Sequence, residues 1–267
     1  MRGLIFALLL LSGAGQAAEL TLELGSGSHR WSSAELLAHP QAQWIEIDED
    51  VSYQRHMRYR GVPLAALLSG VQPGDHLQAV ALDGFAAELP AAALLADSGA
   101  RAWLAVEDPA QPWPPLAPGK PSAGPFYLVW ENPIAGRIGP EQWPFQVARI
   151  RKLASVAERF PQLLPAAAAD VAVQAGFAQY QKHCMACHRL NGSGDSQFGP
   201  DLNIPHNPTE YFAGDFLAAY IRDPQSLRHW PQGRMPGFSA ATLPDGELHQ
   251  LIGYLRHMAG RKTGPSE

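Results

Sequence analysis

The two cysteines of the chain stand three positions apart, in the sequence Cys184-Met185-Ala186-Cys187-His188. Two thiols at this spacing on one helical turn can each form a thioether to a haem vinyl group, and the adjacent histidine can supply an imidazole nitrogen to the iron. A disulfide or a redox dithiol needs no neighbouring histidine, and a structural zinc site needs two further ligands at a matching spacing. The motif therefore predicts one covalent haem c, attached through Cys184 and Cys187, with His188 as an axial ligand.

The segments around this motif have the pattern of a helical domain. Apolar residues recur at helical spacing before the motif and again near the end of the chain. The predicted helices are 168–183, 215–222 and 244–258. Residues 166–262 resemble a class I cytochrome c, in which the first helix ends at the haem motif and the last helix crosses the first. The resemblance implies an all-α domain over 161–267, with Tyr254 near Phe177 or Tyr180.

The same resemblance implies two further residues of the haem site. Gly199-Pro200 matches the family element whose carbonyl, here that of Pro200, accepts a hydrogen bond from the haem histidine and so fixes its tautomer. Met235 lies 47 residues after His188 (235 − 188), in a loop like the one that carries the family's methionine ligand. Its neutral thioether would raise the potential relative to a second histidine. Other candidates for this position are Met185, Met258, His206 and His229.

Residues 18–160 predict an α+β domain with a mixed or antiparallel sheet. Short alternating runs bounded by turn residues predict strands, and Asp83-Gly84 predicts the turn of a hairpin. The predicted strands are 20–24, 44–47, 76–82, 85–89, 102–106, 126–130 and 145–152. Short helices are expected at 33–37, 64–68 and 90–95, and a proline-rich loop at 109–125.

Four short motifs in this region look like the molybdopterin-binding domain of the sulfite-oxidase type. They are 59–68, Asp83-Gly84-Phe85, 124–129 and 143–150, and the resemblance covers about 40–152. That family binds molybdenum through a cysteine thiolate before the segment that here is Gly61-Val62-Pro63-Leu64. Residues 43–60 contain no cysteine. The resemblance therefore implies a degenerate domain that has kept the fold without molybdopterin, although Asp48 or Glu49 could offer an oxygen ligand instead.

A basic cluster in the same region offers a second binding chemistry. Arg55, His56, Arg58 and Arg60 could bind an oxyanion, since guanidinium groups match oxyanions bidentately. His56 with Met57 could bind copper, which accepts imidazole and thioether ligands. The alternative, which we favour, is a solvated strand or loop. The isolated histidines at 29, 39 and 76 are expected at the surface.

The first residues predict export. Arg2, an apolar run at 4–11 and small residues ending at Ala17 form a signal peptide, 1–17, whose apolar run is too short to span a bilayer. The expected product is a soluble periplasmic protein without stable membrane insertion. Its formal charge of −5 becomes −6 when Arg2 is removed (19 basic against 25 acidic residues), which argues against nucleic acid as a partner.

Three functions follow from these features. The first is a periplasmic cytochrome that passes single electrons to redox partner proteins through a haem ligated by histidine and methionine. The degenerate domain would then serve for docking or positioning. This function follows because an iron whose two axial positions are filled has no open site for a substrate. The second is a molybdenum- or other metal-dependent oxidoreductase acting on a small oxyanion such as sulfite. The third is a ligand- or metal-sensing module coupled to the haem.

Overall fold

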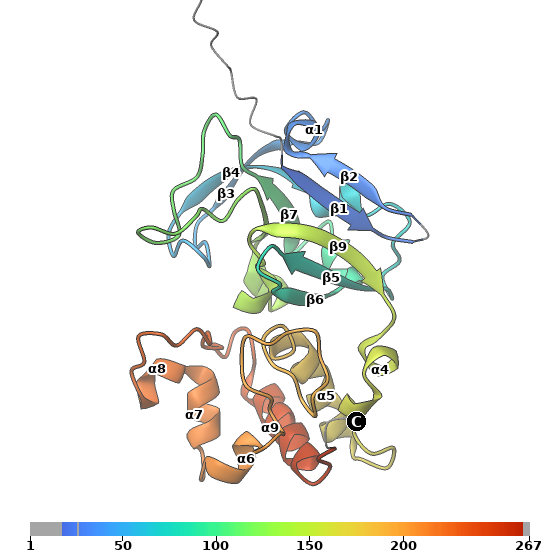
Figure 1. The fold of residues 1–267 in the computed structure, drawn as a ribbon, viewed down its shortest axis with the longest axis vertical. Coiled ribbons are helices and arrows are strands. Elements are labelled where there is room, and N and C mark those ends of the chain that lie inside the picture. The colour runs from blue at the N-terminus through green and yellow to red at the C-terminus, as the bar shows by residue number, and fades with distance from the viewer. Residues whose placement is uncertain (1–17, 26, 264–267) are drawn as a thin grey trace, which may run out of the picture.

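A computed structural model describes residues 18–25 and 27–263, so the predicted signal peptide lies outside the described residues. The described chain has a strand-rich N-terminal region and a helical C-terminal region (Figure 1). The short helix α4 (Val156–Arg159) and the 3₁₀ helix η3 (Pro161–Leu163) connect them. The prediction of an α+β region followed by a helical one is confirmed.

The N-terminal region contains two sheets rather than the one that was expected. The first has the order β2 (His29–Ser32), β1 (Glu19–Glu23), β9 (Val147–Leu153), β5 (His76–Ala81) and β6 (Ala86–Pro90). The second has the order β3 (Gln43–Ile47), β4 (Met57–Pro63), β7 (Arg101–Val106) and β8 (Phe126–Glu131). β1 pairs in parallel with β9, so the first sheet is mixed, whereas the second is antiparallel throughout.

Local signals account for several of these elements. Ser32 caps α1 (Ser33–Leu37) by accepting a hydrogen bond from the Glu35 amide, and the Glu35 carboxylate returns to the Ser32 amide, which is a capping box. The predicted β5–β6 hairpin is confirmed. Its turn contains Gly84 at a φ of +90°, a backbone conformation that glycine adopts without steric cost.

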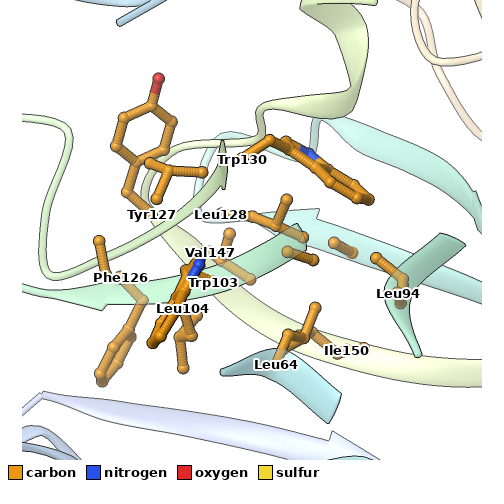
Figure 2. Packing of buried hydrophobic residues seen from close by; sticks show 14 of the residues in the cluster. Leu64, Leu94, Trp103, Leu104, Phe126, Tyr127, Leu128, Trp130, Val147 and Ile150 are labelled. Carbon is orange, nitrogen blue, oxygen red and sulfur yellow. The ribbon is translucent and has the colours of Figure 1, made fainter. Parts of the chain in front are cut away.

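The apolar core of the N-terminal region lies around the two sheets. Figure 2 shows Trp103 and Trp130 packed with leucine and valine side chains from several strands. The Trp130 indole donates a hydrogen bond to the Gln142 carbonyl at 2.8 Å, so burial leaves its polar atom paired. The other helices described in this region are α2 (Leu64–Leu67), α3 (Ala91–Leu94), η1 (Pro133–Gly136) and η2 (Pro140–Gln142).

The helical region is organised by the crossing of its first and last helices. It contains α5 (Val171–His183), α6 (Pro208–Tyr211), α7 (Phe216–Arg222), α8 (Pro224–Leu227) and α9 (Asp245–Ala259). Gly176 allows α5 and α9 to approach closely, because a Cβ there would lie 2.0 Å from the Gln250 carbonyl oxygen. The ring of Tyr254 lies 5.5 Å from that of Phe177 and 5.6 Å from that of Tyr180, so the expected contact is confirmed.

The two regions have separate apolar clusters and meet through polar side chains and through the rings of Phe85 and Phe198, whose centroids lie 5.9 Å apart. Arg159 donates hydrogen bonds to Glu88 in the first sheet at 2.9 Å and to Asp195 in the helical region at 2.6 Å. Gln78 also donates to Asp195, at 2.7 Å. Val156 packs in the apolar cluster of the helical region, so α4 belongs to that core, and the domain boundary at 160/161 remains a prediction. Within the described residues, no helix is both long and apolar enough to cross a bilayer.

Candidate functional site

The cysteine motif forms one backbone turn at the end of α5. The amide of Cys187 donates to the Cys184 carbonyl at 3.1 Å, and the amide of His188 donates to the same carbonyl at 2.8 Å. The Tyr180 hydroxyl, from the last turns of α5, donates to the His188 carbonyl at 3.0 Å. The helix therefore places both thiols and the imidazole on a single turn, which is the arrangement that thioether attachment requires.

The two thiols are not activated as a redox dithiol would be. Cys184 and Cys187 are both free in the structure. Burial, followed by the charge of Glu141, raises the pKa of Cys187 to about 11, and burial raises the pKa of Cys184 further. A catalytic C-x-x-C pair needs a lowered thiol pKa. The environment thus argues against thiol exchange chemistry and leaves attachment of a group as the role of the pair.

His188 has the geometry of a metal ligand with one nitrogen held and one free. Its Nδ1 lies 2.8 Å from the Pro200 carbonyl oxygen, which is the hydrogen bond that the family resemblance implied. Burial lowers the pKa of His188, which favours the neutral imidazole that binds iron. Nε2 makes no hydrogen bond to any residue that the structure describes. This donor set fits a haem iron ligated through Nε2.

Gly199 makes room for the histidine ring. A Cβ at this position would lie 2.3 Å from Cε1 of His188, so any other residue would displace the imidazole or the loop. The amide of Gly199 donates to the Cys187 carbonyl at 2.8 Å, which ties the loop back to the cysteine turn. The residue before the carbonyl acceptor is therefore glycine for a steric reason.

Asp201, which follows Pro200, holds the Pro200 carbonyl in place through hydrogen bonds to the surrounding backbone. Its carboxylate accepts backbone N–H groups at 2.7 Å from Gly192, 2.8 Å from Asn203 and 2.9 Å from Ile204. The buried Asn203 side chain in turn donates to the Met258 carbonyl on α9, also at 2.8 Å. These bonds connect the Pro200 carbonyl to the rigid pair of crossed helices.

Met235 lies on a loop that α7 anchors. Arg222, the last residue of α7, donates to the Phe238 carbonyl at 2.8 Å and to the Leu243 carbonyl at 2.6 Å. Phe238 is buried, and Met235 is partly buried against the same apolar cluster, whereas Trp230 is 58% exposed. The role of Met235 as sixth ligand stays a prediction.

The other candidates for that position have different surroundings. Met185 and Met258 are each only 1% exposed and pack in the apolar cluster of the helical region. His206 and His229 are exposed. Packing gives both methionines a structural role without any ligand, and Met235 remains the partly buried methionine that lies on a loop.

Asp48 and Glu49, which could have offered an oxygen ligand to a metal, are exposed, whereas the neighbouring Asp50 is buried. Asp50 accepts hydrogen bonds from the Tyr59 hydroxyl at 2.8 Å, the Tyr127 hydroxyl at 3.3 Å and the Tyr53 amide, also at 2.8 Å. Burial raises its pKa, and these hydrogen bonds oppose the rise. Both carboxylate oxygens are already engaged, so Asp50 acts as a structural anchor of its loop.

Neighbouring carboxylates pair with two of the four residues of the predicted basic cluster, His56 and Arg58. Arg58 pairs with Glu46 at 3.2 Å, and His56 lies 2.9 Å from Glu46 and 3.1 Å from Asp48. Met57 is buried on the opposite face of the strand from its neighbours, so it does not join His56 in a copper site. No group of three or more His, Cys, Asp or Glu side chains in the described chain is arranged to hold a metal.

One histidine was misplaced by sequence reasoning and another was overlooked. His29 is exposed as expected, but the His76 side chain is only 19% exposed and hydrogen-bonds the buried Glu88. His183 directly precedes Cys184, and its imidazole is fully buried against Glu141. Its position next to the motif was visible in the sequence, but its partner 42 positions away along the chain was not.

Comparisons with known proteins agree with the geometry of the helical region. Residues 173–259 match the cytochrome c family. No curated protein matches the chain significantly. The comparison with solved structures finds a match to the sulfane dehydrogenase SoxCD from Paracoccus pantotrophus, at 20% identity and a TM-score of 0.36 over 52% of this chain. The match spans 38% of that chain's length.

Proposed function

We propose, from the premise that residues 173–259 form a cytochrome c domain, that this protein is a periplasmic carrier of single electrons. A cytochrome c domain implies a covalent haem c and electron transfer through it. The observation that carries the proposal is the motif turn, in which Nδ1 of His188 is held by Pro200 while Nε2 has no protein partner among the described residues.

The proposed haem is attached through Cys184 and Cys187 and ligated by His188 and Met235. The haem supplies the one-electron couple when it is bound, and the surrounding chain sets its environment. The Pro200 carbonyl orients the imidazole and increases its basicity. Arg222 fixes the far end of the methionine loop on α7, which limits how far Met235 can move. With two protein ligands the iron has no position for substrate.

The N-terminal region is proposed to dock or position the haem domain without molybdopterin. Two observations support this role. Residues 43–60 have no cysteine, and the buried Asp50 in the same segment is saturated with hydrogen bonds. The region instead contributes Glu88, Gln78 and Glu141 to polar contacts with the helical region.

Localisation and partners are part of the proposal. The features of residues 1–17 support export, and c-type haem is attached outside the cytoplasm. The acidic balance of the chain supports a redox partner protein with a basic docking face rather than nucleic acid.

The test is spectroscopic and uses full-length protein matured in a periplasm with haem-attachment machinery. We expect a low-spin ferrous spectrum, haem that resists acid–acetone extraction, and one electron per chain in a redox titration. The reduced protein should not bind carbon monoxide. Rapid carbon monoxide binding would show an open iron position and overturn the carrier function.

A further inference from the structure

A carboxylate from the N-terminal region is buried at the junction beside the haem motif. Glu141 lies in η2, and its side chain is 4% exposed. Its Oε1 lies 2.9 Å from Nδ1 of His183, whose side chain is completely buried. Within the described chain, His183 is the only side chain at ion-pair distance from Glu141. A buried carboxylate without a cationic partner costs stability, so its retention calls for an explanation.

The backbone of the N-terminal region is shaped to hold this carboxylate. A Cβ on Gly139 would lie 2.3 Å from Oε2 and 2.4 Å from Oε1 of Glu141, so the carboxylate folds back over a glycine. The Gly139 amide donates to the Gln142 side chain at 3.0 Å, which fixes the short helix that carries Glu141. The position of the carboxylate is therefore determined by its own region as well as by His183.

The hydrogen-bonding pattern assigns the charge of the pair. Oε2 of Glu141 and Nε2 of His183 are both buried and have no partner among the described residues. A doubly protonated His183 would bury an N–H group without an acceptor, which is costly. A neutral imidazole that donates from Nδ1 to an ionised Glu141 satisfies the contact and leaves no buried N–H group without an acceptor, because the two unpartnered atoms, Nε2 and Oε2, are then both acceptors. The pair then carries one negative charge.

Two cations, Lys182 and Arg137, and a second carboxylate, Glu247, lie at the same junction as Glu141. Lys182 on α5 donates to the Arg137 carbonyl at 2.8 Å, and the Arg137 guanidinium pairs with Glu247 on α9. Lys182 therefore interacts with the charge of Glu141 only beyond ion-pair distance. His183 also contacts the apolar ring of Phe238, with ring centroids 5.3 Å apart.

The charge lies close to the attachment site. His183 is bonded directly to Cys184 along the chain, and its ring contacts Phe238 in the methionine loop. A negative charge favours the ferric over the ferrous state, because ferric haem carries one more positive charge.

We propose that Glu141, held by His183, is a positioning residue through which the N-terminal region sets the reduction potential of the haem. The inference rests on the proposed electron-carrier function and gives the N-terminal region a specific part in it. The ionised carboxylate stabilises ferric haem and so holds the potential down. Docking of the two regions and tuning of the haem thereby depend on the same contact.

The test compares reduction potentials of full-length holoprotein variants by spectroelectrochemistry. Glu141→Gln keeps the shape and removes the charge. At a fixed ambient potential we expect its ferrous-to-ferric ratio to rise about tenfold, as for one charge acting through a partly buried medium. Glu141→Asp keeps the charge and should restore most of the wild-type ratio. Glu247→Gln, which removes the other junction carboxylate, should leave the ratio near wild type.

Two further readouts separate tuning from a merely structural role. The ¹⁵N shifts of the His183 imidazole should report a neutral ring protonated at Nδ1 in the wild-type protein. Thermal unfolding should show that Glu141→Gln and Glu141→Asp are folded. Equal potentials in wild type and Glu141→Gln, or a cationic His183, would overturn the inference while leaving a low-spin, one-electron haem intact. Loss of the low-spin haem in the wild-type protein would refute the carrier function instead.

Discussion

Each region of the molecule holds a polar side chain by hydrogen bonds, the buried Asp50 in the N-terminal region and the half-buried His188 in the helical region, and the two bonding patterns differ. In the N-terminal region Asp50 receives hydrogen bonds at both carboxylate oxygens, from Tyr59, Tyr127 and the backbone. In the helical region His188 is held at Nδ1 only, and Nε2 makes no hydrogen bond within the described residues. The saturated Asp50 supports the fold, whereas His188 keeps Nε2 free for the haem iron that the Cys184–His188 motif implies.

The largest effect is expected from His188→Ala. The change removes the proposed proximal ligand while leaving both thiols for attachment. We expect the haem to remain covalently bound but to lose its low-spin spectrum and its wild-type reduction potential, because a thioether alone does not hold the iron low-spin. Absorption spectra and redox titration of the full-length protein would measure this. An unchanged low-spin spectrum would remove His188 from the site.

Met235→Ala should have the next largest effect. Removing the thioether opens one axial position, so the reduced protein should become high-spin and bind carbon monoxide. The matched control is Met258→Ala, which empties a core position on α9 and should cost about 2–5 kcal/mol of stability without opening the iron. Carbon monoxide binding by the Met258 variant alone would transfer the ligand role to that residue.

Gly176→Ala tests the helix crossing that supports the site. The new methyl group would lie 2.0 Å from the Gln250 carbonyl oxygen, so α5 and α9 must separate. We expect a loss of about 2–3 kcal/mol in the free energy of unfolding, the range of overpacking in a filled core. Gly253→Ala on α9 is the control, since nothing lies within 4 Å of its added Cβ, and it should be neutral or slightly stabilising. Equal losses for both variants would refute the close approach.

The smallest effect is expected from Tyr59→Phe in the N-terminal region. It removes the donor to one oxygen of Asp50, and a buried acceptor left unpaired costs about 1–2 kcal/mol. Denaturant unfolding should detect this cost, while the haem potential stays at its wild-type value. Tyr211→Phe, at a tyrosine that is 60% exposed, should change neither. A shift in potential for Tyr59→Phe would mean that the Asp50 cluster is coupled to the haem.

Sequence reasoning succeeded where an element depends on residues that are close to one another along the chain. The helix before the motif, the β5–β6 hairpin and the turn that carries Cys184, Cys187 and His188 depend on neighbours within a few positions, and all of them were predicted. The parallel pairing of β1 with β9, which joins β1 and β2 to the rest of the first sheet, connects segments more than a hundred residues apart and has no local signal.

The same limit explains what was missed at the site. The contacts of Glu141 with His183 and of Asp195 with Arg159 join the two regions through single side chains, and no spacing rule predicts such pairs. His76 was expected at the surface because an isolated histidine usually lies there. It is instead largely buried, because it hydrogen-bonds the buried Glu88 on the other strand of the hairpin. Exposure of an isolated polar residue is decided by the partner, which sequence pattern alone does not identify.

The most direct test of the contrast between the two regions is the metal content of the full-length protein. The protein should be matured in a periplasm that supplies both haem and molybdopterin, and iron and molybdenum should be counted per chain. The account predicts one iron and no molybdenum. The helical region offers Nε2 of His188 to a metal, whereas the N-terminal region offers no thiolate and both oxygens of its buried Asp50 are hydrogen-bonded. Molybdenum at one atom per chain would contradict it and would make the protein an oxidoreductase with a thiolate-free metal site.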